Sequence, residues 1–368
     1  MAYTDEDIQR AVRAGAISRN QADRLIGFLA APEPQAGRPA GDNSEEQFRL
    51  LTGFNDIFIS IVLLLVLGSF LYMSHTISEE IFLPARFAGG IGILPLFESN
   101  QFSALTTAIL AWLLAEYFTK KRRMALPSIL LMCVFILCVF TTFAMSYVSL
   151  FMADAVAQAG RFNIGWPMIV GACGWIGFTA LHWRRFKVPI GFTVGMAGLI
   201  PLSLGILRLF GSDGEDVPAD IALVVLGLIS LGTALWWDSR NTLRVTREAD
   251  IAFWLHILAA GLIVHPLFSN LVSADTVADS LAMLVIYLAL CLVSIVLDRR
   301  AFMTVSLGYS VLAANELFSA SGFEQFPFAV AAFSIGGSLL VLSVMWHPVR
   351  RVVMKAVPEA LKAYLPPG

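Results

Sequence analysis

The sequence predicts an all-α protein, a polytopic bundle of about ten transmembrane helices with both termini in the cytosol. Three observations lead to this fold class. The composition is apolar, with 57% hydrophobic residues, only 14% charged residues and a mean hydropathy of +0.74. Apolar runs long enough to cross a bilayer follow one another along the chain, and Lys and Arg gather in alternate connections between them. A soluble domain has about a quarter of its residues charged, so the soluble class is excluded.

The clearest span is residues 54–73, FNDIFISIVLLLVLGSFLYM, whose last seventeen residues carry no charge. A helix rises about 1.5 Å per residue and therefore needs about 20 apolar residues to cross a hydrocarbon core of roughly 30 Å. An acidic, arginine-containing segment precedes this run. We therefore expect no cleavable signal peptide, and we expect the first span to direct insertion.

Residues 1–31 are predicted to form a short cytosolic helical hairpin. The features that place it are two capping boxes and a glycine that ends the first helix, namely Thr4 with Asp7, Ser18 with Gln21, and Gly15. Each helix has an apolar stripe that so few residues cannot bury alone, so we expect residues 4–31 to contact a cytosolic protein or a second copy of the chain. Residues 32–47 have the Pro, Gly and polar content of a flexible linker.

Part of this segment forms a short Gly-x-Ile-x-x-x-Gln-Ala-x-x-Leu pattern. The residues are Gly15, Ile17, Gln21, Ala22 and Leu25. The pattern resembles the opening of an uncharacterised family of bacterial multi-pass membrane proteins, and it covers under a tenth of the chain. Because that family carries no established activity, the resemblance implies an architecture and no mechanism.

Nine further apolar runs follow the first span within the predicted bundle of residues 48–346. They are residues 101–118, 126–147, 164–183, 188–210, 219–237, 251–272, 278–297, 302–320 and 327–346. Residues 74–100 are predicted to be an outer loop in which residues 81–98 are interfacial or re-entrant, because counting them as a span would invert every later loop. Residues 347–368 are predicted to be a cytosolic tail with an amphipathic helix from Val349 to Leu365, interrupted at Pro358.

The distribution of Lys and Arg sets the predicted orientation. With the N-terminus in the cytosol, 22 of the 25 Lys and Arg residues lie on the inner side, and only Arg86, Arg161 and Arg208 lie outside. The positive-inside rule describes this excess in short loops, so both termini are predicted to be cytosolic. We expect a multi-pass protein of the bacterial inner (cytoplasmic) membrane whose main partner is the lipid bilayer.

Soluble catalytic signatures are missing from the sequence. It contains no Gly-rich phosphate loop, no His-Glu-x-x-His, no Gly-x-Ser-x-Gly and no kinase motif set. All four cysteines lie inside apolar runs without Cys-x-x-Cys spacing or a His partner at ligand spacing, which indicates neither disulfides nor a metal site. We therefore expect no cofactor, no metal and no nucleic-acid partner.

Polar residues inside spans are functional candidates, because lipid does not solvate them unless they face protein or water. Near the inner boundary, Glu116, His182 and His256 are predicted to snorkel toward the headgroups, and Glu116 is spaced to pair with Lys120. Small residues predicted to let helices approach closely are Gly171, Gly174, Gly177, Gly191 and Gly195.

The candidate binding site lies in the outward halves of the spans. Its residues are His265, Asn270, Asn315, Glu316 and Arg208. His265 and Glu316 are each fourteen residues into their predicted spans, so we expect equal depth and a shared pocket in which the two pass a proton. In the alternative, His265 satisfies a backbone carbonyl freed by Pro266, and Glu316 snorkels outward.

Three functional hypotheses follow from these features. The first is a membrane protein that binds or transports a small solute, ion or lipid through the polar residues near the outer face. The second is a non-catalytic sensor or scaffold that recruits a cytosolic partner through residues 4–31. The third is an intramembrane enzyme on lipid-linked substrates with His265 as base, for which no second motif is present. Deleting residues 1–43 separates the first two, because transport would survive the deletion and scaffolding would not.

Overall fold

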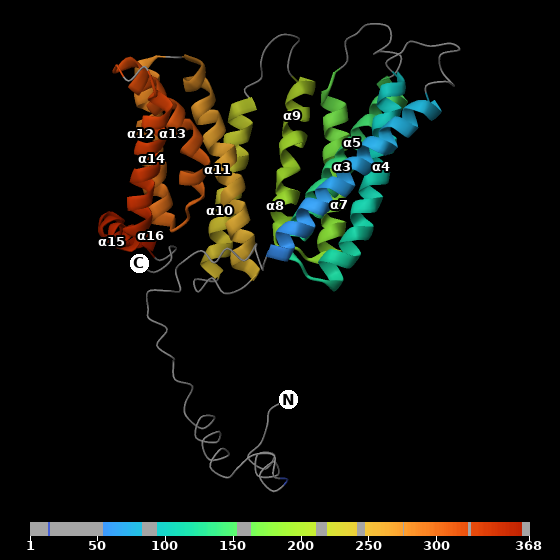
Figure 1. Ribbon diagram of the computed structural model, residues 1–368, viewed down its shortest axis with the longest axis horizontal. Coiled ribbons are helices and arrows are strands. Elements are labelled where there is room, and N and C mark those ends of the chain that lie inside the picture. The colour runs from blue at the N-terminus through green and yellow to red at the C-terminus, as the bar shows by residue number, and fades with distance from the viewer. Residues whose placement is uncertain are drawn as a thin grey trace. The chain divides into compact units, whose positions relative to one another are not determined.

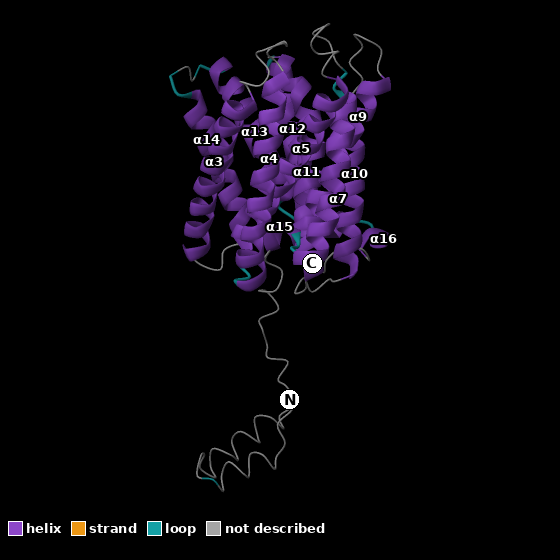
Figure 2. Ribbon diagram, turned by 90° about the vertical axis from the view of Figure 1, so that its right-hand side faces the viewer, coloured by secondary structure: helices purple, strands orange, loops and turns teal. Residues whose placement is uncertain are grey.

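The computed structural model describes residue 14 and residues 54–82, 94–152, 163–210, 219–240, 247–274, 276–322 and 325–362. Apart from residue 14, the predicted hairpin of residues 1–31 and the predicted linker of residues 32–47 lie outside this part of the chain. The described residues form helices joined by short turns, with no strand among them (Figures 1 and 2). The all-α prediction is confirmed for this part.

The long helices alternate in direction along the chain, and α8 and α9 together form one of them (Figure 1). The first group is α3 (Phe54–Phe82), α4 (Leu94–Ala115), α5 (Ala125–Tyr147), α7 (Gly165–Phe186), α8 (Ile190–Ala197) and α9 (Leu199–Phe210). The second group is α10 (Ala219–Arg240), α11 (Arg247–Ala274), α12 (Val277–Leu297), α13 (Ala301–Ala320), α14 (Pro327–Val344), α15 (Trp346–Ala356) and α16 (Glu359–Lys362). Two π-helical turns, Glu116–Lys121 and Val148–Met152, extend α4 and α5.

Nine spans in the described residues are long and apolar enough to cross a membrane. They match nine of the ten predicted runs, with α8 and α9 joined into one span, Ile190–Phe210. The predicted run of residues 164–183 forms α7, a helix of 22 residues whose Gly, Trp, Pro and His content lowers its hydropathy below that of the others. The chain is therefore a multi-pass membrane protein.

The connection between α3 and α4, predicted to be an outer loop, is shorter than expected. Helix α3 runs past Met73 to Phe82, and α4 begins at Leu94, so both ends of the predicted loop of residues 74–100 are helical. The reason lies in the sequence, because no Gly or Pro follows Met73 before Pro84, and Pro95 falls in the first turn of α4, where its missing N–H is tolerated. The re-entrant prediction for residues 81–98 falls mostly on residues outside the described part.

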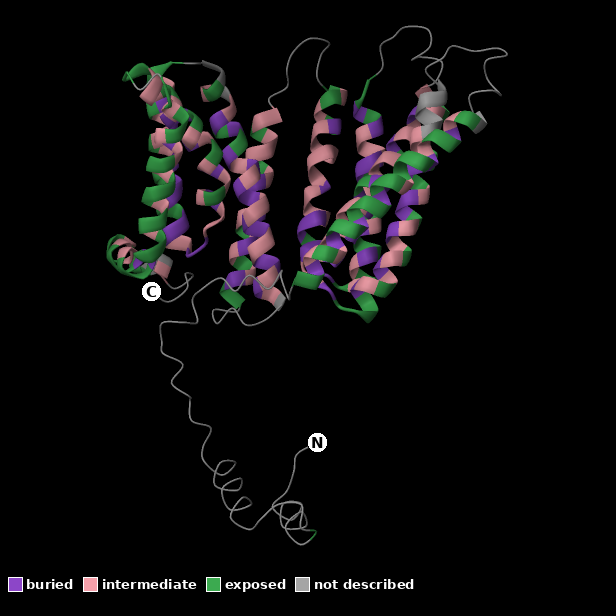
Figure 3. Cartoon of the chain, in the orientation of Figure 1, coloured by how far each residue is buried: buried purple, intermediate pink, exposed green. Residues whose placement is uncertain are grey.

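Buried side chains form two main cores. One joins α3, α4, α5 and α8 around Leu131, Met132 and Ile136, and the other joins α11, α12 and α13 around Val264, Phe268 and Phe302. Much of α3 and nearly all of α14 lie outside the buried core, with only 22% and 6% of their spans buried (Figure 3). In a bilayer these apolar surfaces face lipid.

Close approach of α7 to its neighbours depends on glycine, as predicted for most of the positions named above. A Cβ atom at Gly171 would lie 2.7 Å from the Phe140 ring of α5, and one at Gly191 would lie 2.7 Å from Trp183. A Cβ atom at Gly177 would meet no atom within 4 Å, so this glycine is not a packing position.

One end of the bundle carries the turns α4–α5, α7–α8 and α12–α13 together with α15 (Figure 1). We call it the basic end, because its cations far outnumber its acids. Each of these three turns contains one residue with a left-handed backbone, namely Arg123, Lys187 and Asp298. The predicted tail helix is confirmed in part: α15 ends at Ala356, the chain is extended at Val357, and α16 begins after Pro358.

Candidate functional site

The structure gives the first predicted site residue a different partner from the expected one. His265 Nδ1 of α11 lies 2.8 Å from the Tyr309 hydroxyl of α13, and the Tyr309 ring stacks on Phe268 with centroids 4.9 Å apart. Tyr309 lies seven residues, or about 10 Å along the helix, before Glu316. Within the described residues, no hydrogen bond or ion pair joins His265 to Glu316.

In the described part of the chain, no hydrogen bond or ion pair joins Asn315, Glu316 or Arg208 to His265. On α13, Asn315 is half-buried and Glu316 is exposed, and neither has a polar partner in the described part of the chain. Arg208 is exposed on α9, which packs against α7, α8 and α10, and its carbonyl oxygen accepts from Asn163 Nδ2 at 3.1 Å. Asn270 lies on α11 one turn beyond Pro266, and its side chain is outside the described atoms.

A buried charged cluster that was not predicted lies at the basic end. Arg299, in the α12–α13 turn, donates from Nη2 to Asp238 Oδ1 at 2.6 Å and from Nε to Oδ2 at 3.2 Å. His256 Nε2 of α11 lies 2.9 Å from the same Oδ2 atom. All three residues are at least 92% buried. The cluster joins α10, α11 and the α12–α13 turn, because a buried carboxylate needs both cationic and hydrogen-bonding partners.

A second buried cluster is centred on Asp298, the residue that precedes Arg299. Asp298 Oδ1 accepts from Trp346 Nε1 at 2.9 Å and lies 3.7 Å from Arg350 Nε, which also donates to the Ile295 carbonyl at 3.3 Å. Trp346 and Arg350 belong to α15, so this cluster fixes the tail helix to the α12–α13 turn. A signal for both clusters exists in the sequence: Asp238 and Asp298 are acids at the end of the bundle where cations dominate.

The prediction that polar residues near the basic end snorkel is wrong for two histidines. His182 and His256 are only 1% and 0% exposed. His182 lies among the rings of Trp112, Phe135 and Phe186, whose centroids are 4.5 to 5.8 Å from its own. Both imidazole rings therefore contact side chains of neighbouring helices inside the bundle, and not lipid headgroups.

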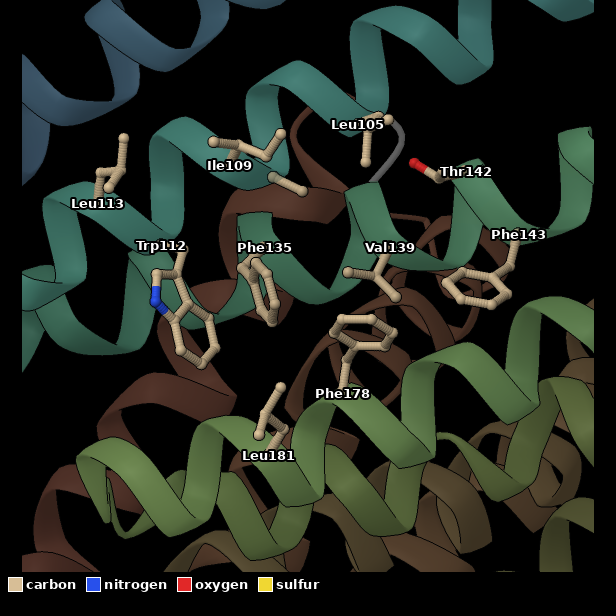
Figure 4. Close-up of a pocket in the computed structure, with 11 residues that line it drawn as sticks. Leu105, Ile109, Trp112, Leu113, Phe135, Val139, Thr142, Phe143, Phe178 and Leu181 are labelled. Carbon is tan, nitrogen blue, oxygen red and sulfur yellow. The ribbon is translucent and has the colours of Figure 1, made fainter.

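An apolar groove opens on the side of the bundle between α4, α5 and α7 (Figure 4). Its volume is about 310 Å³. Phe135 and Val139 of α5 form a buried floor, while Ile109 of α4 and Leu181 of α7 are half-exposed on the two walls. The complete lining is Leu105, Ala108, Ile109, Trp112, Leu113, Phe135, Val139, Thr142, Phe143, Phe178 and Leu181. The Thr142 hydroxyl donates to the Cys138 carbonyl, so it offers little polarity to the groove.

The groove ends at an ion pair near the basic end. Trp112 contacts Phe186 there, with ring centroids 5.1 Å apart, and one turn further Arg185 of α7 binds Glu116 at the end of α4. Arg185 Nε donates to Glu116 Oε1 at 2.7 Å and Nη2 donates to Oε2 at 2.9 Å. Lys120 Nζ, the partner expected from the sequence, lies 3.9 Å from Oε2.

This arrangement can hold an amphiphile and offers no evident catalytic chemistry. An aromatic and aliphatic groove can pack around a hydrocarbon chain on several sides, while charged groups at one end orient a polar head. In the described residues, no three of the His, Cys, Asp and Glu side chains are placed to hold a metal ion.

Comparison with protein-family models, with curated proteins and with solved structures finds no match to this chain. The class of the protein, a multi-pass membrane protein, therefore rests on its own helices. The resemblance carried by residues 15–25 falls outside the described helices and stays a prediction.

Proposed function

We propose that this protein binds a membrane amphiphile in the lateral groove between α4, α5 and α7. The observation that supports the proposal is a groove with a buried apolar floor, open to the side that faces lipid, which ends one helical turn from a charged pair. Ordinary lipid contacts occur on convex helix surfaces, whereas three helices here enclose a concave site with aromatic rings. Such sites are the usual location of small-molecule binding between helices of a bundle.

The proposal is tested by crosslinking with a phospholipid whose acyl chain carries a diazirine. We expect the modified peptides to come from α4, α5 and α7. The variant Ile109→Trp fills the groove from one wall and should reduce this labelling severalfold. A matched control is Ile221→Trp, because Ile221 is also an exposed isoleucine, on α10 and away from the groove. Equal labelling of all apolar helices in the unmodified protein would contradict the proposal.

For orientation, we propose ten spans with both termini cytosolic in a bacterial inner membrane. The excess of cations at the basic end supports this side as the cytosolic one. Helix α7 serves as the tenth span, because its 22 residues give about 33 Å of length and it packs between α5 and α9. A reporter that is active only outside the cytosol should give no signal when fused to Gly368, and a strong signal would exclude the model.

A second candidate function is transport through the polar residues away from the basic end. The hydrogen bond between His265 and Tyr309 favours it, because it joins a titratable ring on α11 to a neighbouring helix, α13. Proteoliposomes that hold a pH-sensitive dye would show proton entry after an imposed pH gradient. Entry that His265→Ala does not slow would remove this candidate. The scaffold hypothesis depends on residues 4–31, and deletion of residues 1–43 still tests it.

A further inference from the structure

We propose that the basic end of the groove binds the headgroup of an anionic glycerophospholipid. Its phosphodiester would lie against Arg185 and Lys120, with one of its acyl chains in the groove. This inference rests on the proposed function, because it names the class of amphiphile that the groove takes.

Helix register places the headgroup site at the end of the groove. On α4, Leu113 lines the groove and Glu116 follows three residues later; on α7, Leu181 lines it and Arg185 follows four residues later. Residues three and four apart share a helix face, so the charged pair continues the same two walls. A chain that fills the groove would therefore end within about one helical turn, roughly 5 Å, of Arg185.

Arg185 retains donors for a second anion. A guanidinium group has five N–H donors, and the two bonds to Glu116 use the Nε–H and one Nη2–H. The remaining three donors lie on a side chain that is 44% exposed. Glu116 thus acts as a positioning residue: it fixes the guanidinium plane, while Lys120, in the π-helical turn that extends α4, adds a second cation 3.9 Å from the same carboxylate.

The charge around this position is complementary to an anion. The α4–α5 and α7–α8 turns bring together seven exposed cations, and Glu116 is the acid that faces them in the described residues. The cations are Lys120, Lys121, Arg122, Arg123, Arg184, Arg185 and Lys187. A phosphodiester with a net negative charge is attracted by these cations, whereas the trimethylammonium group of a zwitterionic choline lipid is repelled by them. Basic sites between transmembrane helices at the cytoplasmic side bind anionic headgroups in this way.

A lipid fits this surface better than a second copy of the chain does. Two copies in the same membrane orientation would bring their seven-cation clusters together at the same depth, and like charges at close range oppose association. A lipid instead brings an apolar chain for the groove and a negative charge for the cations.

The test uses quenching of Trp112 by brominated acyl chains in the purified full-length protein. Trp112 lines the groove, so its signal is the difference between the wild-type protein and Trp112→Phe. The lipids are brominated phosphatidylglycerol, phosphatidylcholine and diacylglycerol. We expect half-maximal quenching to need a mole fraction of phosphatidylglycerol that is about fivefold lower than that of either other lipid. Arg185→Gln or Lys120→Gln should remove most of this preference for phosphatidylglycerol. The control Arg240→Gln removes a cation that stacks on Trp236 of α10, 3.8 Å from the ring centroid, and should leave the preference unchanged.

Each outcome has a separate meaning. Equal quenching by all three lipids would overturn the headgroup proposal and leave groove binding in place. Absence of any Trp112-specific quenching would contradict both proposals. If inorganic phosphate relieves the quenching more than chloride does at equal ionic strength, the site binds a free anion, and the lipid assignment is overturned. Two copies linked through this face, seen as a dimer that Ile109→Trp disrupts, would also overturn it.

Discussion

Arg299 donates hydrogen bonds to both carboxylate oxygens of Asp238, a residue 61 positions earlier in the chain. His256 of α11 contacts one of the same two oxygens. Inside the bundle this carboxylate can stay charged only because it is paired and hydrogen-bonded. The arrangement ties the α12–α13 turn to α10 and α11, and it sets the depth at which that turn lies.

We expect Arg299→Met to lower the free energy of unfolding by about 3–5 kcal/mol, because it leaves the charge of Asp238 buried without its main partner. The double variant Asp238→Asn/Arg299→Met should be less damaging than the sum of the single variants, since no unpaired charge remains. Thermal unfolding of the three proteins in the same detergent measures this. Additive losses would show that the pair is not energetically coupled.

Helix α15 provides a second prediction, on local stability. Asp298→Asn keeps a residue that tolerates the left-handed backbone and can still accept from Trp346, but it loses the charge opposite Arg350. Loss of a charge-assisted contact of about 1.5–3 kcal/mol should raise the open population of α15 at least tenfold. Trypsin cleavage at the exposed Arg351 and Lys355 should accelerate by the same factor, because cleavage follows the open population.

The control for this experiment is Asp279→Asn, which removes an acid at the opposite end of α12. Equal acceleration by both variants would mean that α12 as a whole is destabilised. An unchanged cleavage rate in Asp298→Asn would mean that Trp346 and apolar packing alone hold α15.

Glycine positions on α7 allow a matched comparison within one helix. Gly171→Ala would place a Cβ atom 2.7 Å from the Phe140 ring and 3.1 Å from the Phe140 carbonyl oxygen, so the α5–α7 contact must open, at about 1–3 kcal/mol. Gly177→Ala meets no atom within 4 Å and should be neutral or stabilising by up to about 1 kcal/mol, because alanine favours the helix. Melting temperatures in detergent should therefore move in opposite directions, and a shared decrease would argue against the packing explanation.

The sequence predicted the helices well because each depends on local composition. Residues 54–73 and eight of the nine other apolar runs identify their spans without knowledge of any partner. Partners across helices could not be predicted in the same way, because they depend on the relative depth of helices that meet only in the folded bundle. Asp238 and Arg299 are recognisable as charges near a boundary, but nothing local indicates that they meet.

The same limit explains the misplaced partner of His265. The equal-depth argument assumed that two helices begin at the same level, but the buried Arg299 places the start of α13 well above that of α11. His256 and His265 are nine residues apart on α11, while Arg299 and Tyr309 are ten residues apart on the other side. Both contacts therefore fit a single alignment of α11 along α13. In this register His265 is level with Tyr309 and about 10 Å from the level of Glu316.

This register leads to the last prediction, a pair of double-mutant cycles on α11 and α13. His265→Ala and Tyr309→Phe remove the two partners of one hydrogen bond, so their effects on unfolding free energy should be coupled by about 0.6–1.7 kcal/mol, the range for such bonds between membrane helices. His265→Ala and Glu316→Gln should be additive, because two helical turns separate Glu316 from the residue that His265 contacts. The measurement is unfolding in a denaturing detergent followed by tryptophan fluorescence. If His265 were strongly coupled to Glu316 and not to Tyr309, this register would be wrong and the pocket predicted from the sequence would be supported instead.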